Sequence, residues 1–197
     1  AGYDLEVEDY HFTILLGNPE KPMLQLNKGY SGDGGIPGYL MLSLLPNDYT
    51  LPRVQAALAH ECNHNVRFQF IKWNQQTTLA DWVVSEGLAE SFAAELYGED
   101  LIGPWVTSTS SEQLEEIKPI ISSQLQLTGM AEMAPYLYGD EIAKIQGQIP
   151  VGMPYAAGYA YGYHLIQAYL KKTGKNIIEA TVTPTEEILE ATKDFWK

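Results

Sequence analysis

The sequence has little cysteine, little positive charge and no long apolar run. Its one cysteine, Cys62, excludes an intramolecular disulfide and a four-cysteine zinc finger. No apolar run approaches the roughly 18 residues of a membrane-spanning helix, so we expect no such helix. Lys and Arg number 12 against 25 Asp and Glu, and this net charge of −13 disfavours binding to nucleic acids and to anionic lipid surfaces.

The N-terminal segment is acidic and does not have the composition of a signal peptide. Residues 1–10 contain no basic residue followed by an apolar stretch, which a secretory signal requires. The removal of an earlier signal peptide stays open, and we favour a cytoplasmic location. The sequence does not indicate an oligomeric state.

The first part of the chain has the composition of β-strands. β-Branched and aromatic residues predict strands over residues 10–16 and 39–45, and alternation of apolar and polar residues predicts one over 23–27. The segment 31–38 is so rich in glycine that it predicts a loop. His11 falls in the first strand, where we expect a structural role.

The rest of the chain has the spacing of helices. Apolar residues recur at helical intervals over 52–70, 79–97 and 155–172, over a helix at 111–127 that Pro119 interrupts or kinks, and in short pieces within 131–146. Thr183 and Glu186 have the spacing of a capping box that opens the last helix. Strands followed by helices predict a single α+β domain over residues 1–197, with 1–49 mainly β around a small antiparallel or mixed sheet and 50–197 mainly α.

The chemistry of the sequence centres on HECNH at residues 60–64, an H-E-x-x-H motif. Residues four apart lie on one helix face, so His60 and His64 can both reach one zinc ion. Glu61 lies one step round the helix, where it can take a proton from a water bound to the metal. The alternative is a buried polar helix face with two hydrogen-bonded histidines, which is costly without a strong partner.

A third ligand is expected from SEGLAE at residues 85–90. The chain between His64 and Glu86 is long enough to end one helix, turn and return antiparallel, which places Glu86 near the histidines. Glu90, one turn further on, can accept a hydrogen bond from a ligating imidazole and fix its tautomer. The alternative for both carboxylates is a solvated face, the role that we assign to Glu95.

HECNH followed by SEGLAE resembles the gluzincin metallopeptidases, and the chain is most similar to a bacterial family of YjaZ-like predicted zinc-dependent proteases (domain of unknown function 2268). A glycine-rich segment before the motif and GYAYGY at 158–163 extend the likeness over roughly residues 10–172. The resemblance implies a zincin-like fold with an active-site helix, one zinc ion held by His60, His64 and Glu86, and Glu61 as the base. It assigns no substrate.

Further residues are candidates for the rest of a peptidase site. Amide hydrolysis needs a hydrogen-bond donor near the developing oxyanion, for which we select Tyr159 first, then Tyr163 and His164. The alternative is that this aromatic stripe only packs. An extended peptide can add to the edge of the strand at 39–45 under a flap formed by 32–38, unless that segment is an ordinary loop. Cys62 is expected to be a small buried residue that points away from the metal.

We therefore expect a zinc metallopeptidase that hydrolyses peptide bonds of a peptide or protein substrate through a water activated by Glu61. One alternative is a catalytically silent binding or regulatory module with a peptidase-like fold and a retained metal site. The intact Glu61 argues against it. Another is a structural zinc site, but three ligands beside a free carboxylate are typical of an open catalytic site.

Overall fold

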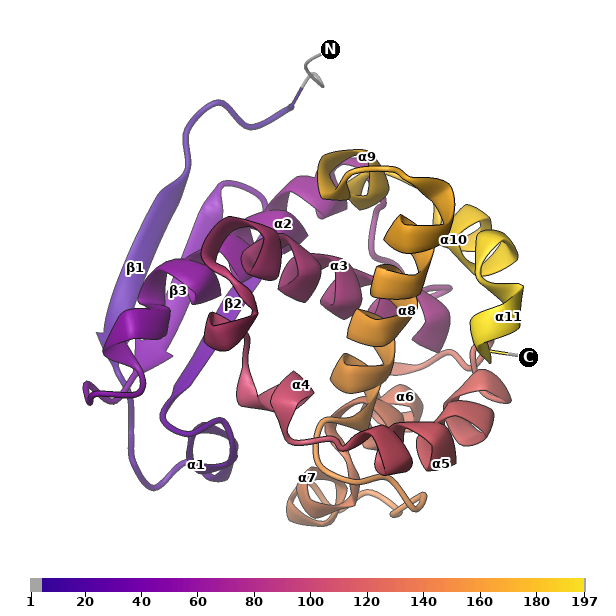
Figure 1. Cartoon of the computed structure of the whole chain (residues 1–197). Coiled ribbons are helices and arrows are strands. Elements are labelled where there is room, and N and C mark those ends of the chain that lie inside the picture. The colour runs from indigo at the N-terminus through magenta and orange to yellow at the C-terminus, as the bar shows by residue number, and fades with distance from the viewer. Residues whose placement is uncertain (1–4, 197) are drawn as a thin grey trace.

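The computed structural model describes residues 5–196, so residues 1–4 of the acidic N-terminal segment and residue 197 lie outside it. The fold is α+β, as predicted: a three-stranded sheet comes first and helices follow (Figure 1). The elements are β1 (His11–Leu16), α1 (Pro22–Leu26), β2 (Tyr30–Ile36), β3 (Tyr39–Leu44), η1 (Leu51–Arg53), α2 (Val54–Phe70), α3 (Leu79–Tyr97), η2 (Glu99–Leu101), α4 (Pro104–Thr107), α5 (Ser111–Ser122), α6 (Met130–Tyr138), α7 (Asp140–Ile145), α8 (Ala157–Thr173), α9 (Ile177–Thr181), α10 (Thr185–Ala191) and α11 (Lys193–Trp196).

The sheet is mixed, and β3 is its central strand. In the order β1-β3-β2, β1 runs parallel to β3 and β2 antiparallel to it. Leu40, Leu42 and Leu44 alternate along β3 and are buried, as expected for a strand with one face on a core. Because β3 has a neighbour on both sides, the prediction that a peptide adds to its edge is wrong, and among the described strands β1 and β2 provide the edges.

The residues at 23–27 form a helix, so the strand predicted there is wrong. Helix α1 begins with Pro22 at its first turn, a position that suits the fixed φ of proline. Of its residues only Leu24 is buried. Five residues are too few to distinguish the alternation of a strand from one turn of a helix. The wrong prediction at 23–27 follows from this short length.

The glycine-rich segment is strand β2 and not a loop. A Cβ atom at Gly32 would meet the carboxylate of Glu61, and one at Gly34 would meet the backbone of Glu61. The glycines therefore allow β2 to lie directly against the helix that carries the motif, which outweighs their low strand propensity.

The β2–β3 hairpin is also fixed to α2 by Asn65. Its side-chain amide donates to the carbonyl oxygens of Gly34, Ile36 and Tyr39, at 3.0, 2.7 and 3.0 Å, and its oxygen accepts from the nitrogen of Gly38 at 2.7 Å. These contacts bind the turn of the hairpin to α2. The segment 32–38, predicted as a mobile flap, is therefore held in the sheet.

Three long helices make the frame of the molecule. Helices α2 and α3 lie side by side, and α8 crosses α3 (Figure 1). At the crossing a Cβ on Gly87 would meet the backbone of Gly162, and one on Gly162 would meet Val83, so both glycines serve close helix approach. The close neighbours of Gly87 thus belong to α8, which explains a glycine in the middle of α3.

The predicted helices at 52–70, 79–97 and 155–172 are confirmed to within two residues, whereas α5, α9 and α10 differ from the prediction. Helix α10 begins after Pro184 without a side-chain cap, because the Thr183 hydroxyl donates to the Glu179 carbonyl oxygen, so the predicted capping box is wrong. Helix α9 was not predicted. Helix α5 runs through Pro119 and ends at Ser122.

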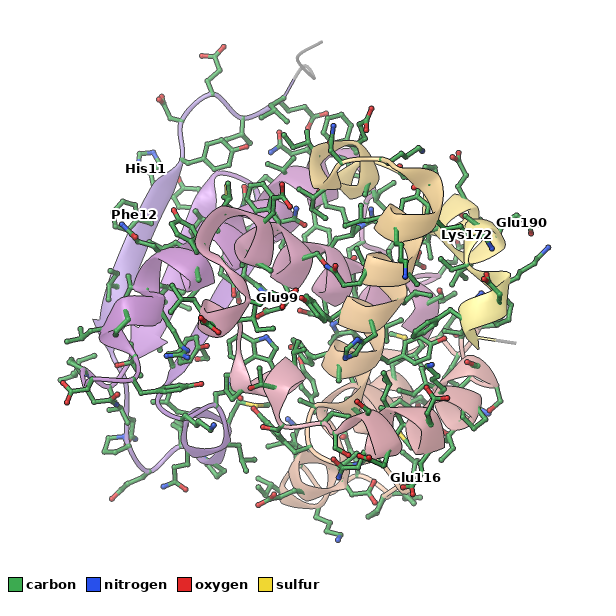
Figure 2. The ribbon with its side chains drawn as sticks, in the orientation of Figure 1. His11, Phe12, Glu99, Glu116, Lys172 and Glu190 are labelled. Carbon is green, nitrogen blue, oxygen red and sulfur yellow. The ribbon has the colours of Figure 1, made fainter. Side chains whose placement is uncertain are left out.

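The strand β1 lies at the outer edge of the sheet, and its side chains are exposed. Figure 2 shows His11 and Phe12 on β1 on the side of the molecule away from α8, and the His11 ring stacks on Tyr39 at 5.6 Å between ring centres. Within residues 5–196 no helix has the length and apolar character needed to cross a membrane.

Candidate metal centre

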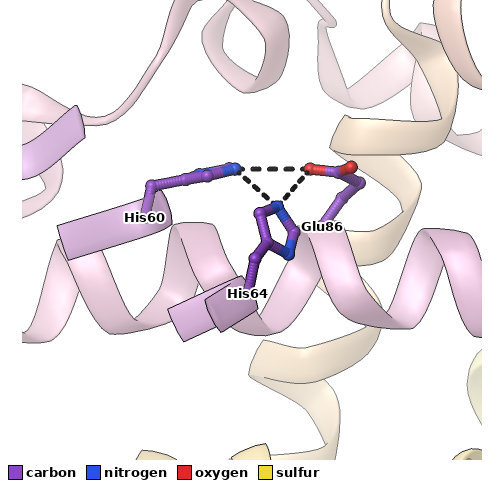
Figure 3. A group of neighbouring side chains, drawn as sticks. All are labelled: His60, His64 and Glu86. Carbon is purple, nitrogen blue, oxygen red and sulfur yellow. Dashed lines mark hydrogen bonds and ion pairs between the residues drawn. The ribbon is translucent and has the colours of Figure 1, made fainter. Parts of the chain in front are cut away.

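Three buried side chains from α2 and α3 point their donor atoms at one point. The Nε2 atoms of His60 and His64 lie 3.1 Å apart, and Oε2 of Glu86 lies 3.3 Å from the former and 3.2 Å from the latter (Figure 3). The structure thus brings together the three predicted ligands, and the side chains form a potential metal-binding group.

The triangle has the dimensions of a tetrahedral zinc site. With bonds of about 2.0–2.1 Å, two ligands of a tetrahedral zinc ion are roughly 3.4 Å apart. The three separations of 3.1, 3.2 and 3.3 Å are close to that value. Two imidazole nitrogens and one carboxylate oxygen are also the donor types that zinc takes in catalytic sites, so the residues present fit this ion.

The local sequence explains why the ligands converge. Helix α2 ends at Phe70, and α3 begins after Thr78, whose side chain and backbone form a capping box with Asp81. The chain therefore returns along α2 and places Glu86 opposite the two histidines, as the spacing predicted.

Glu90 orients His60 from behind. Its Oε2 lies 2.7 Å from Nδ1 of His60 and accepts from Nε1 of Trp105 at 2.7 Å, and its Oε1 accepts from the nitrogen of Gly103. A carboxylate held by these donors favours a proton on Nδ1 of His60, which leaves Nε2 free to bind a metal. The predicted contact between Glu90 and an imidazole nitrogen is thus present, and its effect on metal binding stays a prediction.

The electrostatics of the triangle favour an ionised Glu86. Burial raises its pKa, but the charge of His64 and hydrogen bonds from both histidines lower the pKa to about 2. Nε1 of Trp82 also donates to Oε1 of Glu86 at 3.2 Å. Burial lowers the pKa of His60, but the hydrogen bonds to Glu86 and Glu90 raise it well above its ordinary value.

Glu61 lies beside the triangle and takes no part in it. Burial raises the pKa of its carboxyl, the two neighbouring histidines lower it, and the charges of Glu86 and Asp33 raise it again, so the net pKa is higher than usual. Among the described residues it has no hydrogen-bond partner. A carboxylate in this position can exchange a proton with a molecule in the site.

Two cavities meet at these residues. One has a volume of about 240 Å³ and the other about 580 Å³, and His60, Glu61, Gly32, Tyr138 and Tyr159 line both. Tyr159 is therefore where the sequence predicted it, at the cleft. Burial, then the charge of Glu86, raises the pKa of its hydroxyl well above the ordinary value, so the phenol remains a hydrogen-bond donor.

Tyr138 is a site residue that the sequence did not reveal. It lines both cavities, its ring lies 6.1 Å from that of Tyr159, and burial raises its pKa. It is the last residue of α6 and lies outside every motif. The glycine that follows it, Gly139, ends α6 at a φ of 89° and is the only local sign of a sharp change of direction there.

The other candidates lie away from the cavities. The Tyr163 hydroxyl donates to Glu99 at 3.5 Å, and His164 is near enough to Lys118 for that charge, with burial, to lower its pKa. The structure does not bring either residue to the metal centre. Glu95 is exposed, as expected. Cys62 is half-buried on the other side of α2, beside Asn63 and Val66.

Comparisons with known proteins give the family of this chain. A family model described as "Predicted Zn-dependent protease (DUF2268)" matches residues 2–190. The chain belongs to this family, as the motifs indicated.

Two curated relatives come from Bacillus subtilis strain 168. The uncharacterized protein YjfC is 41% identical over 186 residues, which cover 94% of this chain and 62% of YjfC. The uncharacterized protein YjaZ is 26% identical over 155 residues, which cover 77% of this chain and 55% of YjaZ. The chain thus spans less than two thirds of the length of either relative. No solved structure matches, so the zincin-like part of the fold stays a prediction.

Proposed function

We propose that this protein is a zinc-dependent metallopeptidase that hydrolyses peptide bonds. The observation that carries the proposal is the triangle of His60, His64 and Glu86 atoms at 3.1–3.3 Å, with the unpaired carboxylate of Glu61 beside it in the wall of both cavities. The family is that of predicted zinc-dependent proteases, which supports the same chemistry.

His60, His64 and Glu86 hold the ion, one per chain, and Glu90 keeps the His60 ring in place. A zinc ion bound there supplies a Lewis acid that polarises a carbonyl group and makes water more acidic. Glu61 accepts the proton of the attacking water and transfers it to the leaving amine. Tyr159, with Tyr138 beside it, donates a hydrogen bond to the oxygen on which negative charge develops.

The substrate is an extended peptide or a segment of a protein. Strand β2 is at one edge of the sheet, and Gly32, Asp33, Gly34 and Gly35 of this strand line the larger cavity. An edge strand offers backbone donors and acceptors to an added strand. We infer that an added peptide lies along β2, in place of the excluded edge of β3.

The Glu61→Gln variant tests the proposal. We expect it to bind zinc in the same ratio as the wild type and to lose peptide cleavage by about 10²–10⁴-fold, because only the proton transfer is removed. Metal content is measured by elemental analysis, and cleavage by mass spectrometry of a peptide library with and without a chelator. His60→Ala and Glu86→Ala are controls that lose the metal.

A wild-type protein that carries zinc but cleaves no peptide in a chelator-sensitive manner would contradict the proposal. That outcome would favour a silent module that binds peptides through a retained metal site.

A further inference from the structure

The larger cavity at the metal centre is walled by apolar side chains that the proposed chemistry does not use. They are Phe68, Trp73, Trp82, Met130 and the ring of Tyr138. The volume of about 580 Å³ is in the range of sites that enclose a small organic group. The lining therefore describes a binding site with a chemical preference of its own.

The aromatic rings of this wall form a continuous series of ring contacts that begins at His64, a predicted metal ligand. The His64 ring is stacked on Phe68 at 5.6 Å between centres, with an angle of 7° between the planes. Phe68 meets Trp73 edge-on at 5.8 Å, and Trp73 meets Trp82 at 5.5 Å. Trp82 in turn meets Tyr138 at 5.7 Å. Edge-to-face contacts of this kind hold the rings in fixed positions, so the wall is preformed.

Part of this wall is not core packing. Among the residues that the structure describes, Phe68 and Trp73 belong to none of the buried hydrophobic clusters. Trp73 is 38% exposed and Met130 53% exposed at the cavity. Apolar side chains that remain in contact with water beside a formed cavity are typical of ligand-binding surfaces.

The position of the wall relative to the metal centre sets which part of a peptide reaches it. Phe68 follows His64 by one turn on α2, and Trp82 precedes Glu86 by one turn on α3. Because the two helices are antiparallel, both steps run in the same direction. The wall is therefore displaced from the ligand atoms by about one helical turn, roughly 5.4 Å, which a side chain flanking the reacting carbonyl can span.

We propose that this cavity is a subsite for an aromatic side chain, and that the protein selects peptides with Phe, Tyr or Trp next to the cleaved bond. The selection of peptides for cleavage rests on the proposed peptidase function. The binding preference itself requires only the wall of Phe68, Trp73, Trp82 and Tyr138.

The first test measures binding without cleavage. N-acetyl-L-tryptophanamide and N-acetyl-L-alaninamide have no free carboxylate to bind a metal, and each is titrated into the zinc-loaded protein and followed by ligand-observed NMR. We expect the tryptophan amide to bind at least about tenfold more tightly. Equal affinities for the tryptophan and alanine amides would overturn the inference, and this result does not depend on whether any variant folds.

Variants assign the preference to this wall. Phe68→Leu and Trp73→Leu keep an apolar side chain and are expected to reduce the affinity for the tryptophan amide by about threefold to tenfold. Tyr97→Leu is the matched control, since Tyr97 is an aromatic residue that is 39% exposed, close to the 38% of Trp73, and lies outside the cavity lining. Wild-type affinity in both wall variants, with their thermal unfolding unchanged, would overturn the assignment.

Cleavage of paired peptides separates this inference from the proposed function. Two peptides that differ only by Phe or Ala next to the cleaved bond are compared, and we expect kcat/KM to be at least about tenfold higher for Phe. Cleavage without this preference would overturn the subsite and leave the peptidase intact. Selective binding of the tryptophan amide without any cleavage would support the subsite and contradict the peptidase.

Discussion

Glu90 is a buried carboxylate that contacts the His60 ring on the side away from the three converging donor atoms. It contacts Nδ1 of His60, Nε1 of Trp105 and the nitrogen of Gly103, and it is 2% exposed. These donors fix the carboxylate, and the carboxylate fixes the imidazole. These contacts suit Glu90 to hold the His60 ring in a fixed position.

Replacing Glu90 by glutamine should weaken metal binding by about 10–100-fold, because the neutral amide no longer holds the proton on Nδ1 of His60 as firmly and presents an NH₂ group to surrounding donors. Competition with a fluorescent chelator measures the zinc affinity. Glu95→Gln, an exposed carboxylate on the same helix, serves as the control and should leave the affinity unchanged. An unaltered affinity in Glu90→Gln would show that His60 needs no such support.

At this scale the sequence predicted that His60, His64 and Glu86 come together, because H-E-x-x-H and the return to Glu86 depend only on helical geometry and on one turn. Tyr138 could not be predicted in this way. It reaches the cleft from α6, which is brought there by packing between segments distant in the chain. Tyr163 shows the reverse case, since it shares the helical stripe of Tyr159 but contacts Glu99 on another side.

Among the elements, the β2–β3 hairpin depends most on a single side chain. Asn65 makes four hydrogen bonds to hairpin backbone atoms from the residue directly after His64. Asn65 therefore joins the β2–β3 hairpin to α2, the helix that carries His60 and His64.

The variant Asn65→Ala should lower the free energy of unfolding by about 3 kcal/mol, because it leaves several buried backbone groups without partners. Urea denaturation measures this loss, and hydrogen exchange should show faster exchange across residues 30–44. Asn18→Ala removes one exposed contact to the nitrogen of Glu20 and should have little effect. Slow exchange in the hairpin of Asn65→Ala would mean that the sheet holds it without the helix.

The same hairpin shows where sequence patterns fail for elements. Seven residues with glycine at Gly32, Gly34 and Gly35 have low strand propensity, yet they form β2 because only glycine fits against Glu61 at two of these positions. At α1 a strand was predicted and a helix is found, because the segment is too short to show the period of either. The long helices α2, α3 and α8 were predicted to within two residues, because their pattern extends over several turns.

At the scale of the whole molecule, Arg67 connects α2 to the segment that contains α9 and α10. Its side chain is fully buried and donates to the carbonyl oxygens of Thr181 and Thr183 at 2.8 and 3.1 Å, and to Ser85 and Thr185 at 3.2 Å each. Burial lowers its pKa to about 10. Among the described residues it forms no salt bridge, so backbone oxygens solvate the charge.

Substitution of Arg67 by methionine should therefore cost about 3 kcal/mol of stability, since two buried carbonyl oxygens lose their donors. Chemical denaturation gives the value, and limited proteolysis should cut the C-terminal helices earlier than in the wild type. Lys172→Met, at an exposed pair with Asp194, is the control with little expected change. Equal stability of both variants would show that the C-terminal helices dock through their apolar contacts alone.

Metal removal should lower the stability of the whole protein. A ligand that binds only the folded state stabilises it by about 2.7 kcal/mol at a free concentration of about one hundred times its Kd. Differential scanning calorimetry with and without a chelator measures the expected fall in Tm. In His64→Ala the chelator should cause no fall, and a similar fall there would point to metal bound elsewhere.

The donor set has a consequence for how the protein is made. His64 and Glu86 are 22 positions apart, and His60 and Glu90 are 30 apart, so the centre has low contact order and its closure costs little chain entropy. All of its donor residues have been synthesised once α3 is complete, before α8 to α11. The donor atoms of α2 and α3 can therefore come together before α6 and α8, which carry Tyr138 and Tyr159, pack against them.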